Sequence, residues 1–279
     1  MKKACVIGWP ISHSRSPLIH NYWLKTHGIT GSYERVPVEA AALLPFLKGL
    51  AAAGYAGCNV TLPHKEAAFT AVDFVDDIAA RIGVVNTIYI KDGMLLGAST
   101  DGEGFIANLL ANARTLHLEN QRAVLLGAGG AAMAIVGALL DQGVSEIALI
   151  NRTLDRSERL REKFGKHIVP LPWHARADAL ADSALLVNTT LLGMSGQAPL
   201  DIDLGKLPTC ATVADIVYSP LETPLLMAAR ARGNETVGGL GMLLHQAVRG
   251  FELWFGPRPQ VTAALYDLVA RDVDPDYRR

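Results

Sequence analysis

The chain has 279 residues, of which half are hydrophobic and 19% are charged, as in an ordinary soluble globular enzyme. At roughly 150 residues per domain, this length predicts about two domains. The formal net charge of −1 leaves no broad basic surface that would attract nucleic acid. The three cysteines, Cys5, Cys58 and Cys210, are scattered and lack the spacing of a zinc site or of a disulfide scaffold.

Two apolar segments need an explanation other than export or membrane insertion. The run near the N-terminus ends at Trp9-Pro10 and is too short for a secretory signal. Between Arg122 and Asp141 lie eighteen uncharged residues, but four of them are glycines that would interrupt a membrane-spanning helix. We therefore expect a cytoplasmic protein.

In the first hundred residues, short β-branched runs alternate with helical stretches, which predicts α/β architecture. We expect strands at 4–9, 32–38, 57–62, 84–90 and 94–99, and helices at 17–27 and 40–53. The Lys91-Asp92-Gly93 turn would join the last two strands as a hairpin, so this sheet is expected to be mixed.

From residue 123 onward the alternation of strands and helices is more regular and predicts a parallel sheet. A helix over 102–113 would connect this half to the first, and helices over 240–255 and 261–273 would end the chain. The strands are expected at 123–128, 146–151, 167–171, 184–190, 212–218 and 234–239.

A glycine-rich turn, Gly127-x-Gly129-x-x-Ala132, lies between a predicted strand and a helix that continues to about Gln142. The first glycine permits a tight turn, the second lets the backbone approach a pyrophosphate, and the small third residue lets the helix pack on the strand. The helix N-terminus would face the phosphates. A glycine turn without a ligand is the alternative, but the strand, turn, helix and second strand together favour a dinucleotide-binding unit over residues 123–153.

The end of that unit indicates which dinucleotide binds. An NAD site would place Asp or Glu here for the ribose 2′-hydroxyl, whereas this chain has Asn151, Arg152 and Thr153, with Arg156 one turn later. The arginines can bind a 2′-phosphate, and cations are disfavoured at a helix N-terminus unless an anion is present. Two solvated surface arginines are the alternative. The pattern favours NADP.

The first of three polar segments contains Ser14 and Ser16 before Pro17. Ser16 suits the N-cap of a helix that begins at Pro17, so helix capping accounts for it. Capping does not account for Ser14.

The second polar segment runs from Asn59 to Lys65, with Asn59 and Thr61 on one face at the end of a strand. Pro63 would start a helix and place Lys65 in its first turn, where the helix dipole disfavours a cation. A residue that breaks a local rule of helix structure is a candidate functional residue. A lysine amine in this position could transfer a proton. An exposed lysine paired with Glu66 or Glu39 is the alternative. His64 is expected to be a packing residue or to support a neighbouring site residue rather than to bind a metal.

The third polar segment is Ser99-Thr100-Asp101-Gly102, before the predicted helix 102–113. Asp101 is either the N-cap of that helix or the partner of Lys65, which it would orient and with which it would share a transferable proton. Asn86 adds an amide that could bind hydroxyls if it faces the same cleft.

Eight ordered motifs span nearly the whole chain and together resemble those of the shikimate dehydrogenase family. They are SHSRSP at 12–17, GCNVTLPHK at 57–65, GVVNTI at 83–88, STDGEGF at 99–105, GAGGAA at 127–132, NRT at 151–153, DIVYSPLETPLL at 215–226 and GLGMLLHQAVRGFELWFG at 239–256.

The resemblance implies a two-domain α/β fold, with an N-terminal mixed-sheet substrate domain and a Rossmann NADP-binding domain. The substrate domain would comprise 1–101 and the returning C-terminal helices in 238–279, and the NADP domain 102–237. It also implies reversible, NADP-dependent reduction of 3-dehydroshikimate to shikimate, in the shikimate pathway of aromatic amino-acid and chorismate biosynthesis. No metal, nucleic acid or membrane partner is expected, and the protein is expected to be a monomer or homodimer.

The resemblance also implies roles for individual residues, carried over position by position. Lys65 and Asp101 resemble the catalytic pair. The substrate contacts would be Ser14, Ser16, Thr61, Asn86, Asp101, Tyr218 and Gln246. The NADP contacts would be Gly127, Ala128, Gly129, Gly130, Ala131, Asn151, Arg152, Thr153, Arg156, Asp77, Ile216 and Gly239.

Two positions depart from the family pattern. Ser99 stands where Asn usually precedes Thr-Asp-Gly, and Gly238 stands where Asp commonly precedes Gly-Leu. Ser99 lies two residues from Asp101, which leaves open quinate or a related polyol as the better substrate. The alternatives are an NAD-dependent quinate/shikimate dehydrogenase, a non-catalytic NADP-binding regulator and, from the apolar segment alone, a membrane protein.

Overall fold

A computed structural model describes residues 2–278, and the chain in it divides into two compact units. Unit 1 comprises Met1–Gly104 and Leu243–Val269, and unit 2 comprises Phe105–Met242 and Ala270–Arg279. The boundaries fall inside three helices, α5 (Asp101–Asn112), α9 (Leu240–Phe255) and α10 (Ala263–Val273). They lie a few residues beyond the boundaries expected from the sequence, and they group residues 270–278 with unit 2.

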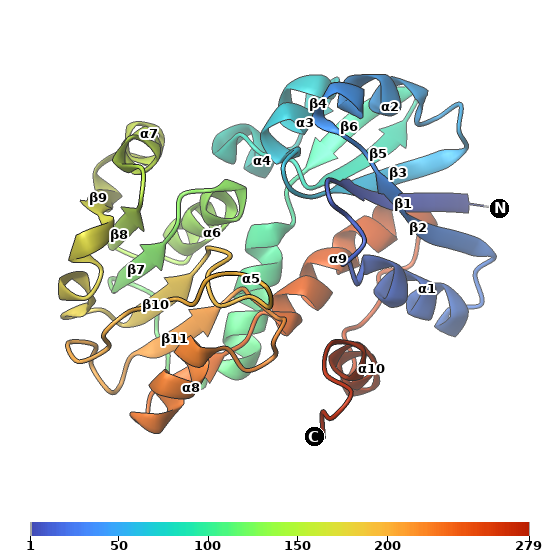
Figure 1. Cartoon of the computed structure of the whole chain (residues 1–279). Coiled ribbons are helices and arrows are strands. Elements are labelled where there is room, and N and C mark those ends of the chain that lie inside the picture. Colours follow the sequence, from blue (N-terminus) through green and yellow to red (C-terminus); the bar gives the residue numbers. More distant parts are fainter. Residues whose placement is uncertain (1, 279) are drawn as a thin grey trace. The chain divides into compact units, whose positions relative to one another are not determined.

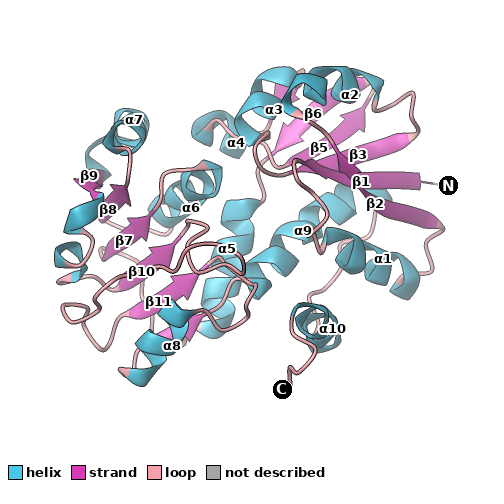
Figure 2. Ribbon diagram, viewed as in Figure 1, coloured by secondary structure: helices cyan, strands magenta, loops and turns pink. Residues whose placement is uncertain are grey.

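Unit 1 is built on a six-stranded mixed sheet with helices around it (Figures 1 and 2). Its strands are β1 (Lys2–Gly8), β2 (Gly31–Pro37), β3 (Tyr55–Val60), β4 (Phe74–Val75), β5 (Thr87–Lys91) and β6 (Met94–Ala98). They lie in the order β2-β1-β3-β5-β6-β4. β1 pairs in parallel with β2 and β3, while β5 pairs antiparallel with β3 and β6, which confirms the expected mixed sheet.

The helices of unit 1, besides its parts of α5, α9 and α10, are α1 (Ser16–Thr26), the 3₁₀ turn η1 (Ala40–Ala42), α2 (Leu43–Gly49), α3 (Lys65–Ala71) and α4 (Asp77–Ile82). The helix predicted over 40–53 is therefore shorter. Pro45 in its sequence is tolerated only in a first turn, so the regular helix begins at Leu43. The sequence did not predict β4 or α4, because two residues of strand and six of helix are too short to show a period.

Alternation along β1 and β3 separates two cores in unit 1. Cys5 and Ile7 on β1 and Cys58 and Val60 on β3 pack with α2, α3 and α4. Asn59 lies between Cys58 and Val60 and so projects to the opposite face, because successive strand residues alternate. On that face lies a cluster of aromatic rings from α1, β2 and α9, which comprises His20, Trp23, Tyr33, Phe251 and Trp254.

Unit 2 contains six parallel strands. They are β7 (Arg122–Leu126), β8 (Glu146–Asn151), β9 (Ile168–Pro172), β10 (Leu185–Asn188), β11 (Thr212–Asp215) and β12 (Glu235–Val237). Their order, β12-β11-β10-β7-β8-β9, is that of a doubly wound dinucleotide-binding sheet, in which the direction of winding reverses between β7 and β10. The strands labelled β9, β8, β7, β10 and β11 follow one another across the sheet in Figure 1.

Both faces of this sheet are covered, so residues 123–126 of β7, after Arg122, are all apolar. Ala123 and Leu125 pack on α5, α6 (Gly130–Asp141) and α7 (Leu154–Phe164), whereas Val124 and Leu126 pack on α8 (Pro224–Ala231) and its neighbours. This arrangement explains the eighteen uncharged residues that resembled a membrane segment. None of the helices in residues 2–278 has the length and hydropathy to cross a membrane. The short 3₁₀ turns of this unit are η2 (Gly165–His167), η3 (Trp173–Ala175) and η4 (Asp178–Leu180).

Four strands of unit 2 end earlier than predicted, and side chains account for two of these ends. β7 ends at Leu126 rather than at Ala128. β10 ends at Asn188, whose Oδ1 accepts the backbone N–H of Thr190. β11 ends at Asp215 rather than at Tyr218, because the Asp215 carboxylate accepts the N–H of Val217 and takes it out of the ladder. β12 covers 235–237 rather than 234–239.

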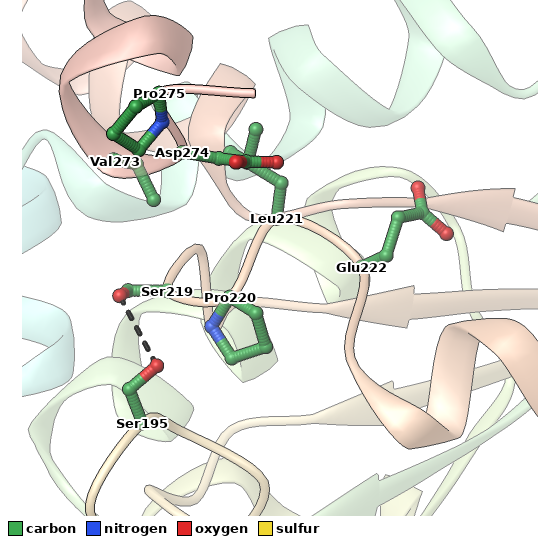
Figure 3. Close-up of a pocket in the computed structure, with 8 residues that line it drawn as sticks. All are labelled: Ser195, Ser219, Pro220, Leu221, Glu222, Val273, Asp274 and Pro275. Carbon is green, nitrogen blue, oxygen red and sulfur yellow. Dashed lines mark hydrogen bonds between the residues drawn. The ribbon is translucent and has the colours of Figure 1, made fainter. Parts of the chain in front are cut away.

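The loops after β10 and β11 border a pocket in unit 2 (Figure 3). None of its lining residues was predicted to belong to the functional site. They are Ser195, Ser219, Pro220, Leu221, Glu222, Val273, Asp274 and Pro275.

His20 is fully buried in the aromatic cluster of unit 1 and stacks on Tyr33 with 4.1 Å between ring centroids. Neither ring nitrogen has a hydrogen-bond partner among the described residues. Removal from water disfavours the charged imidazolium, so burial lowers the pKa of His20 to about 3. The folded protein therefore keeps this ring neutral.

His20 should make folding sensitive to acid. Because its folded pKa lies below the unfolded value of 6.5, the unfolded chain binds the extra proton as the pH falls from 6.5 toward 3, and stability should fall by about 1.4 kcal/mol per pH unit there. His20→Phe keeps the stacking and should remove this part of the pH dependence in urea unfolding. His117→Gln, at an exposed histidine, should keep it. Equal pH slopes for wild type and His20→Phe would contradict the assignment.

Candidate active site

Lys65 is the first residue of α3, directly after the loop that follows β3. Its Nζ contacts Oδ2 of Asp101, and only 13% of the Lys65 side chain and 7% of the Asp101 side chain are exposed. Two charges so far removed from water are tolerated because they compensate each other. The alternative of a surface lysine paired with Glu66 or Glu39 is therefore wrong.

Asp101 is the first residue of α5, and both of its carboxylate oxygens are engaged by side chains. Oδ2 accepts from Lys65, and Oδ1 accepts from Nδ2 of Asn86 at 2.8 Å. The carboxylate therefore serves the ion pair rather than the helix N-terminus that the capping alternative assigned to it.

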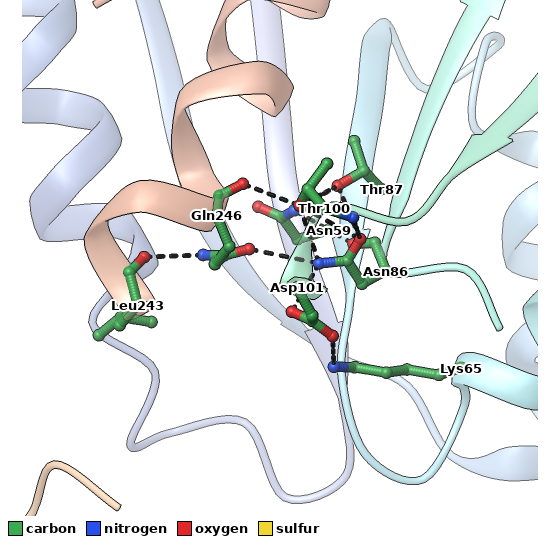
Figure 4. A network of polar contacts seen from close by, with 8 residues as sticks. All are labelled: Asn59, Lys65, Asn86, Thr87, Thr100, Asp101, Leu243 and Gln246. Atoms are coloured by element: carbon green, nitrogen blue, oxygen red, sulfur yellow. Dashed lines mark hydrogen bonds and ion pairs between the residues drawn. The ribbon is translucent and has the colours of Figure 1, made fainter. Parts of the chain in front are cut away.

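Asn86 is the centre of the polar network in Figure 4. Its Oδ1 accepts the backbone N–H of Thr100 at 2.8 Å. Its Nδ2, besides donating to Asp101, lies 3.0 Å from Oγ1 of Thr100 and 3.4 Å from Oε1 of Gln246. One amide thus joins the segment before α5, the acid of the ion pair and helix α9.

Gln246 enters this network from α9. Its Nε2 donates to the backbone carbonyl of Leu243 at 2.9 Å. The backbone carbonyl of Gln246 accepts from Oγ1 of Thr100 at 2.8 Å. Gly104 on α5 allows this approach, because a Cβ there would lie 2.6 Å from the backbone nitrogen of Gln246. The returning helix and the start of α5 therefore meet backbone to backbone within unit 1.

A second layer of polar residues supports Asn86 from behind. Asn59 Nδ2 donates to the carbonyl of Asn86 at 3.1 Å and to Oγ1 of Thr87 at 3.2 Å, while its Oδ1 accepts from the Tyr33 hydroxyl at 2.6 Å. Sequence reasoning did not identify Tyr33. The available signal was a tyrosine at an inward position of a strand, since a buried phenol needs a partner for its hydroxyl.

The Ser14 and Ser16 hydroxyls lie 3.2 Å apart at the start of α1. The expectation that Ser16 caps this helix is wrong, because Ser16 is already helical and Arg15 occupies the N-cap position, where its side chain makes no capping hydrogen bond. The carbonyl of Ser14 accepts from Nε of Arg35 at 2.8 Å. Arg35 thereby fixes the loop, a role for which the sequence carried no signal.

Thr61 and His64 lie in the loop between β3 and α3. Thr61 donates its backbone N–H to the carbonyl of Ile7 at 3.0 Å, which fixes the loop to the end of β1. His64 is buried, and its Nε2 lies 2.6 Å from the carbonyl of Val38. The prediction that His64 is a packing residue is confirmed.

The glycine-rich turn of unit 2 has the conformation that its sequence predicted. Gly127 has a φ of +105°, and a Cβ there would lie 2.8 Å from Oγ1 of Thr189. Gly129 is the N-cap of α6, and no atom from elsewhere in the protein lies within 4 Å of the position that its Cβ would take. The turn therefore leaves open space in front of the N-terminus of α6, where a phosphate can approach backbone N–H groups.

The residues that favoured NADP follow β8. Nδ2 of Asn151 donates to the carbonyl of Thr153 at 2.8 Å and shapes the turn into α7. Arg152 and Arg156 are both exposed, so their guanidinium groups are accessible to an anion. Asp155 is also in the first turn of α7 and offsets part of their charge.

The remaining predicted residues occupy separate places. Gly239 packs on the loop after β11, where a Cβ would lie 2.2 Å from the carbonyl oxygen of Ile216, and Tyr218 is half-buried in that loop. Asp77 is the first residue of α4, next to Asp76, which caps the helix through the N–H of Ala79 at 2.8 Å.

The predicted site residues divide between the two units. Unit 1 contains Ser14, Ser16, Thr61, Lys65, Asp77, Asn86, Asp101 and Gln246. Unit 2 contains residues 127–131, Asn151, Arg152, Thr153, Arg156, Ile216, Tyr218 and Gly239. No group of three or more His, Cys, Asp or Glu side chains within residues 2–278 could hold a metal ion.

Comparisons with known proteins identify the family to which the chain is similar. Residues 6–88 match the shikimate dehydrogenase substrate binding domain, 109–192 the shikimate/quinate 5-dehydrogenase model, and 239–264 the shikimate 5′-dehydrogenase C-terminal domain. The shikimate dehydrogenase (NADP(+)) of Rhodopseudomonas palustris strain HaA2 is 55% identical over 276 residues, which cover 97% of this chain and 96% of that protein.

This chain belongs to the shikimate dehydrogenase family.

Two solved structures of the family place the fold in the same group. The shikimate 5-dehydrogenase of Thermus thermophilus, in complex with NADP(H) and shikimate, is 36% identical, with a TM-score of 0.87 over 98% of this chain and all of that one. The quinate dehydrogenase of Corynebacterium glutamicum, in complex with NAD, is 30% identical, with a TM-score of 0.88 over 96% of this chain and 99% of that one. The fold therefore accommodates more than one substrate and cofactor.

Asn86→Ala should destabilise unit 1, because it leaves the buried N–H of Thr100 and one oxygen of Asp101 without their partner. We expect a loss of about 1–3 kcal/mol in the free energy of unfolding measured with urea. Asn112→Ala is the matched control, since Asn112 is exposed and donates only within its own helix. Similar losses in both variants would mean that the network contributes no more than a surface amide.

Proposed function

We propose that this chain is an NADP-dependent shikimate dehydrogenase that reversibly reduces 3-dehydroshikimate to shikimate. The observation that carries the proposal is the mostly buried Lys65–Asp101 pair, which supplies a proton donor beside a hydrogen-bond acceptor. The proposal is also supported by a relative named shikimate dehydrogenase (NADP(+)), which is 55% identical over 97% of this chain. Unit 1 is the proposed substrate unit, and unit 2 the proposed NADP unit.

The residues of unit 2 fit two groups of NADP, the pyrophosphate and the 2′-phosphate of the adenosine. The open space at Gly129 and the N-terminus of α6 suit the pyrophosphate, and the exposed Arg152 and Arg156 suit the 2′-phosphate. Ile216 and Gly239, whose backbones touch, would line the nicotinamide end. NADPH, when bound, supplies the hydride that reduces the ketone.

Lys65 is the proposed proton donor. As the ketone carbon is reduced, its oxygen becomes an alkoxide, and the Nζ of Lys65 transfers a proton to it; in the reverse direction the neutral amine takes that proton back. Asp101 orients the Nζ through Oδ2 and can also accept from the neighbouring substrate hydroxyl. Asn86 holds the carboxylate in this position through Oδ1.

The other polar side chains are proposed to orient the substrate. The paired Ser14 and Ser16 hydroxyls can donate to the substrate carboxylate, and Arg35 keeps their loop in place. Thr61, Asn86 and Gln246 would contact hydroxyls, with Tyr218 over the substrate near the nicotinamide. Asp77 is proposed to lie near the cofactor.

Lys65→Ala should lower kcat by roughly 10²–10⁴-fold while KM for shikimate changes only a few-fold, because the variant loses proton transfer rather than binding. Lys65→Met keeps the volume of the side chain and should give the same kcat, with thermal unfolding to check folding. Lys48→Ala, at an exposed lysine in unit 1, should leave kcat and KM unchanged. A kcat for Lys65→Ala within a few-fold of wild type would contradict the role.

The double variant Arg152→Ala/Arg156→Ala should raise KM for NADP by at least tenfold and leave KM for NAD nearly unchanged, because only NADP carries the 2′-phosphate. Initial rates with each cofactor measure the ratio. Arg159→Ala, an exposed arginine further along α7, is the control and should keep the preference for NADP. A parallel loss with both cofactors would place the arginines elsewhere than at the 2′-phosphate.

One panel of assays separates the alternatives. Rates with shikimate and quinate, each with NADP and NAD, distinguish the proposed enzyme from an NAD-dependent quinate/shikimate dehydrogenase. Binding of NADP without turnover of 3-dehydroshikimate would instead indicate a regulator that keeps only the fold.

A further inference from the structure

Asp215 is a buried carboxylate that the proposed chemistry does not use. It ends β11 with 2% of its surface exposed. Its Oδ1 accepts from the N–H of Val217 and from Nδ2 of Asn188, both at 3.0 Å, and its Oδ2 accepts from Oγ1 of Thr223 at 2.8 Å. A buried carboxylate without a cation is costly, which calls for a function that offsets the cost.

The three donors lie in or beside the two loops that leave the carboxyl end of the sheet. Asn188 ends β10, and its Oδ1 accepts from the N–H and the hydroxyl of Thr190 at 3.0 and 2.7 Å. Thr189, between them, donates its hydroxyl to the carbonyl of Leu126 at 2.7 Å and packs against Gly127 of the glycine-rich turn. Asp215 is thereby connected to the proposed pyrophosphate site.

On its other side, Asp215 fixes the loop 216–222 at both ends. Val217 is bound at the beginning of the loop, and Thr223, directly after it, is the N-cap of α8. The middle of the loop is joined to the loop after β10 by the N–H of Ser195, which donates to the carbonyl of Ser219 at 2.7 Å, and by their hydroxyls at 3.4 Å (Figure 3). The pocket in that figure leaves one side of the loop without packing.

We propose that Asp215 is a positioning residue, whose ionised carboxylate holds the loop 216–222 in the conformation that receives the nicotinamide end of NADP. The inference rests on the proposed function, because it needs Ile216 and Tyr218 of this loop to face the cofactor. Ionised Asp215 accepts three hydrogen bonds, whereas a protonated carboxyl group must give up one acceptor position to its own O–H.

Burial raises the pKa of Asp215 to about 6, against the stabilising effect of its three hydrogen bonds. The charged groups on neighbouring elements are engaged elsewhere. Glu235 on β12 pairs in register with Thr212, away from Asp215, and accepts the N–H of Arg114 at 2.8 Å. β10 contains no titratable residue.

The remaining titratable groups near the loop lie on the loop itself, on α8 and at Asp274, which lines the pocket together with residues 219–222 of the loop. Glu222 and Arg230 pair with each other at 2.6 Å, and Tyr218 is the other titratable side chain of the loop. No charged partner among the described residues contributes to the pKa of Asp215. The ionised fraction of Asp215 should therefore fall about tenfold between pH 7 and pH 5.

The test is the Kd of NADP⁺ measured by titration calorimetry at pH 7 and pH 5. If only the ionised form presents the loop correctly, protonation of Asp215 should raise the wild-type Kd about tenfold between pH 7 and pH 5. The 2′-phosphate of NADP⁺ titrates in the same range and adds its own change to the Kd. Asp215→Asn, which is never ionised, should bind at least tenfold more weakly at pH 7 and show only the 2′-phosphate change. Asp203→Asn, at an exposed carboxylate of unit 2, should behave as wild type.

A second pair of variants covers the case in which Asp215→Asn does not fold. Thr223→Val removes one bond to the carboxylate and should weaken NADP⁺ binding at pH 7, whereas Thr223→Ser keeps the hydroxyl and should restore it. Equal Kd values and equal pH dependence in wild type and Asp215→Asn, or in the two Thr223 variants, would overturn the positioning role. Absence of NADP⁺ binding by wild type would instead overturn the proposed function.

Discussion

The removal of the Asp101 carboxylate from water is the constraint on which the arrangement of unit 1 depends. A buried carboxylate is stable only when its oxygens find partners, and here Lys65 takes one oxygen and Asn86 the other. Asn86 can do so only while its own Oδ1 is held by Thr100, and while Asn59 holds its carbonyl. One small region around Asn86 must therefore bring together the ends of β3 and β6 and the starts of α3 and α5.

Asp215 in unit 2 shows a different solution to the same problem. Its partners are neutral donors, so no cation balances its negative charge, and burial raises its pKa. Asp101 has a cation beside it that can also serve as a proton donor. The neutral donors around Asp215 suit a carboxylate that positions a loop. The lysine beside Asp101 suits the proposed role in proton transfer. Both carboxylates lie where strands end, which is where α/β sheets leave backbone groups and loops available for ligands.

How far the sequence predicted these features depended on whether the signal was local. The glycine turn at 127–132, the mixed and parallel sheets and the position of Lys65 at a helix start follow from short patterns, and the structure has them. The ends of β10 and β11 did not follow, because Asn188 and Asp215 capture backbone N–H groups that a strand pattern assigns to the ladder. Tyr33 and Arg35 support the site from β2, which is distant in sequence from Asn59 and Ser14, and no local pattern reports such contacts.

The two departures from the family pattern differ in what the fold requires. A Cβ at Gly238 would lie 3.6 Å from the nearest atom, the carbonyl oxygen of Leu221, so packing does not demand glycine there. Ser99 is 2% exposed, and its hydroxyl has no partner among the described residues. A side chain enclosed in this way does not reach a ligand directly. Ser99 can act on substrate choice only through the backbone of Thr100, whose N–H binds Asn86, and through Asp101 beyond it. Discrimination between shikimate and quinate is therefore expected to follow the position of the Asn86–Asp101 network rather than a contact made by residue 99.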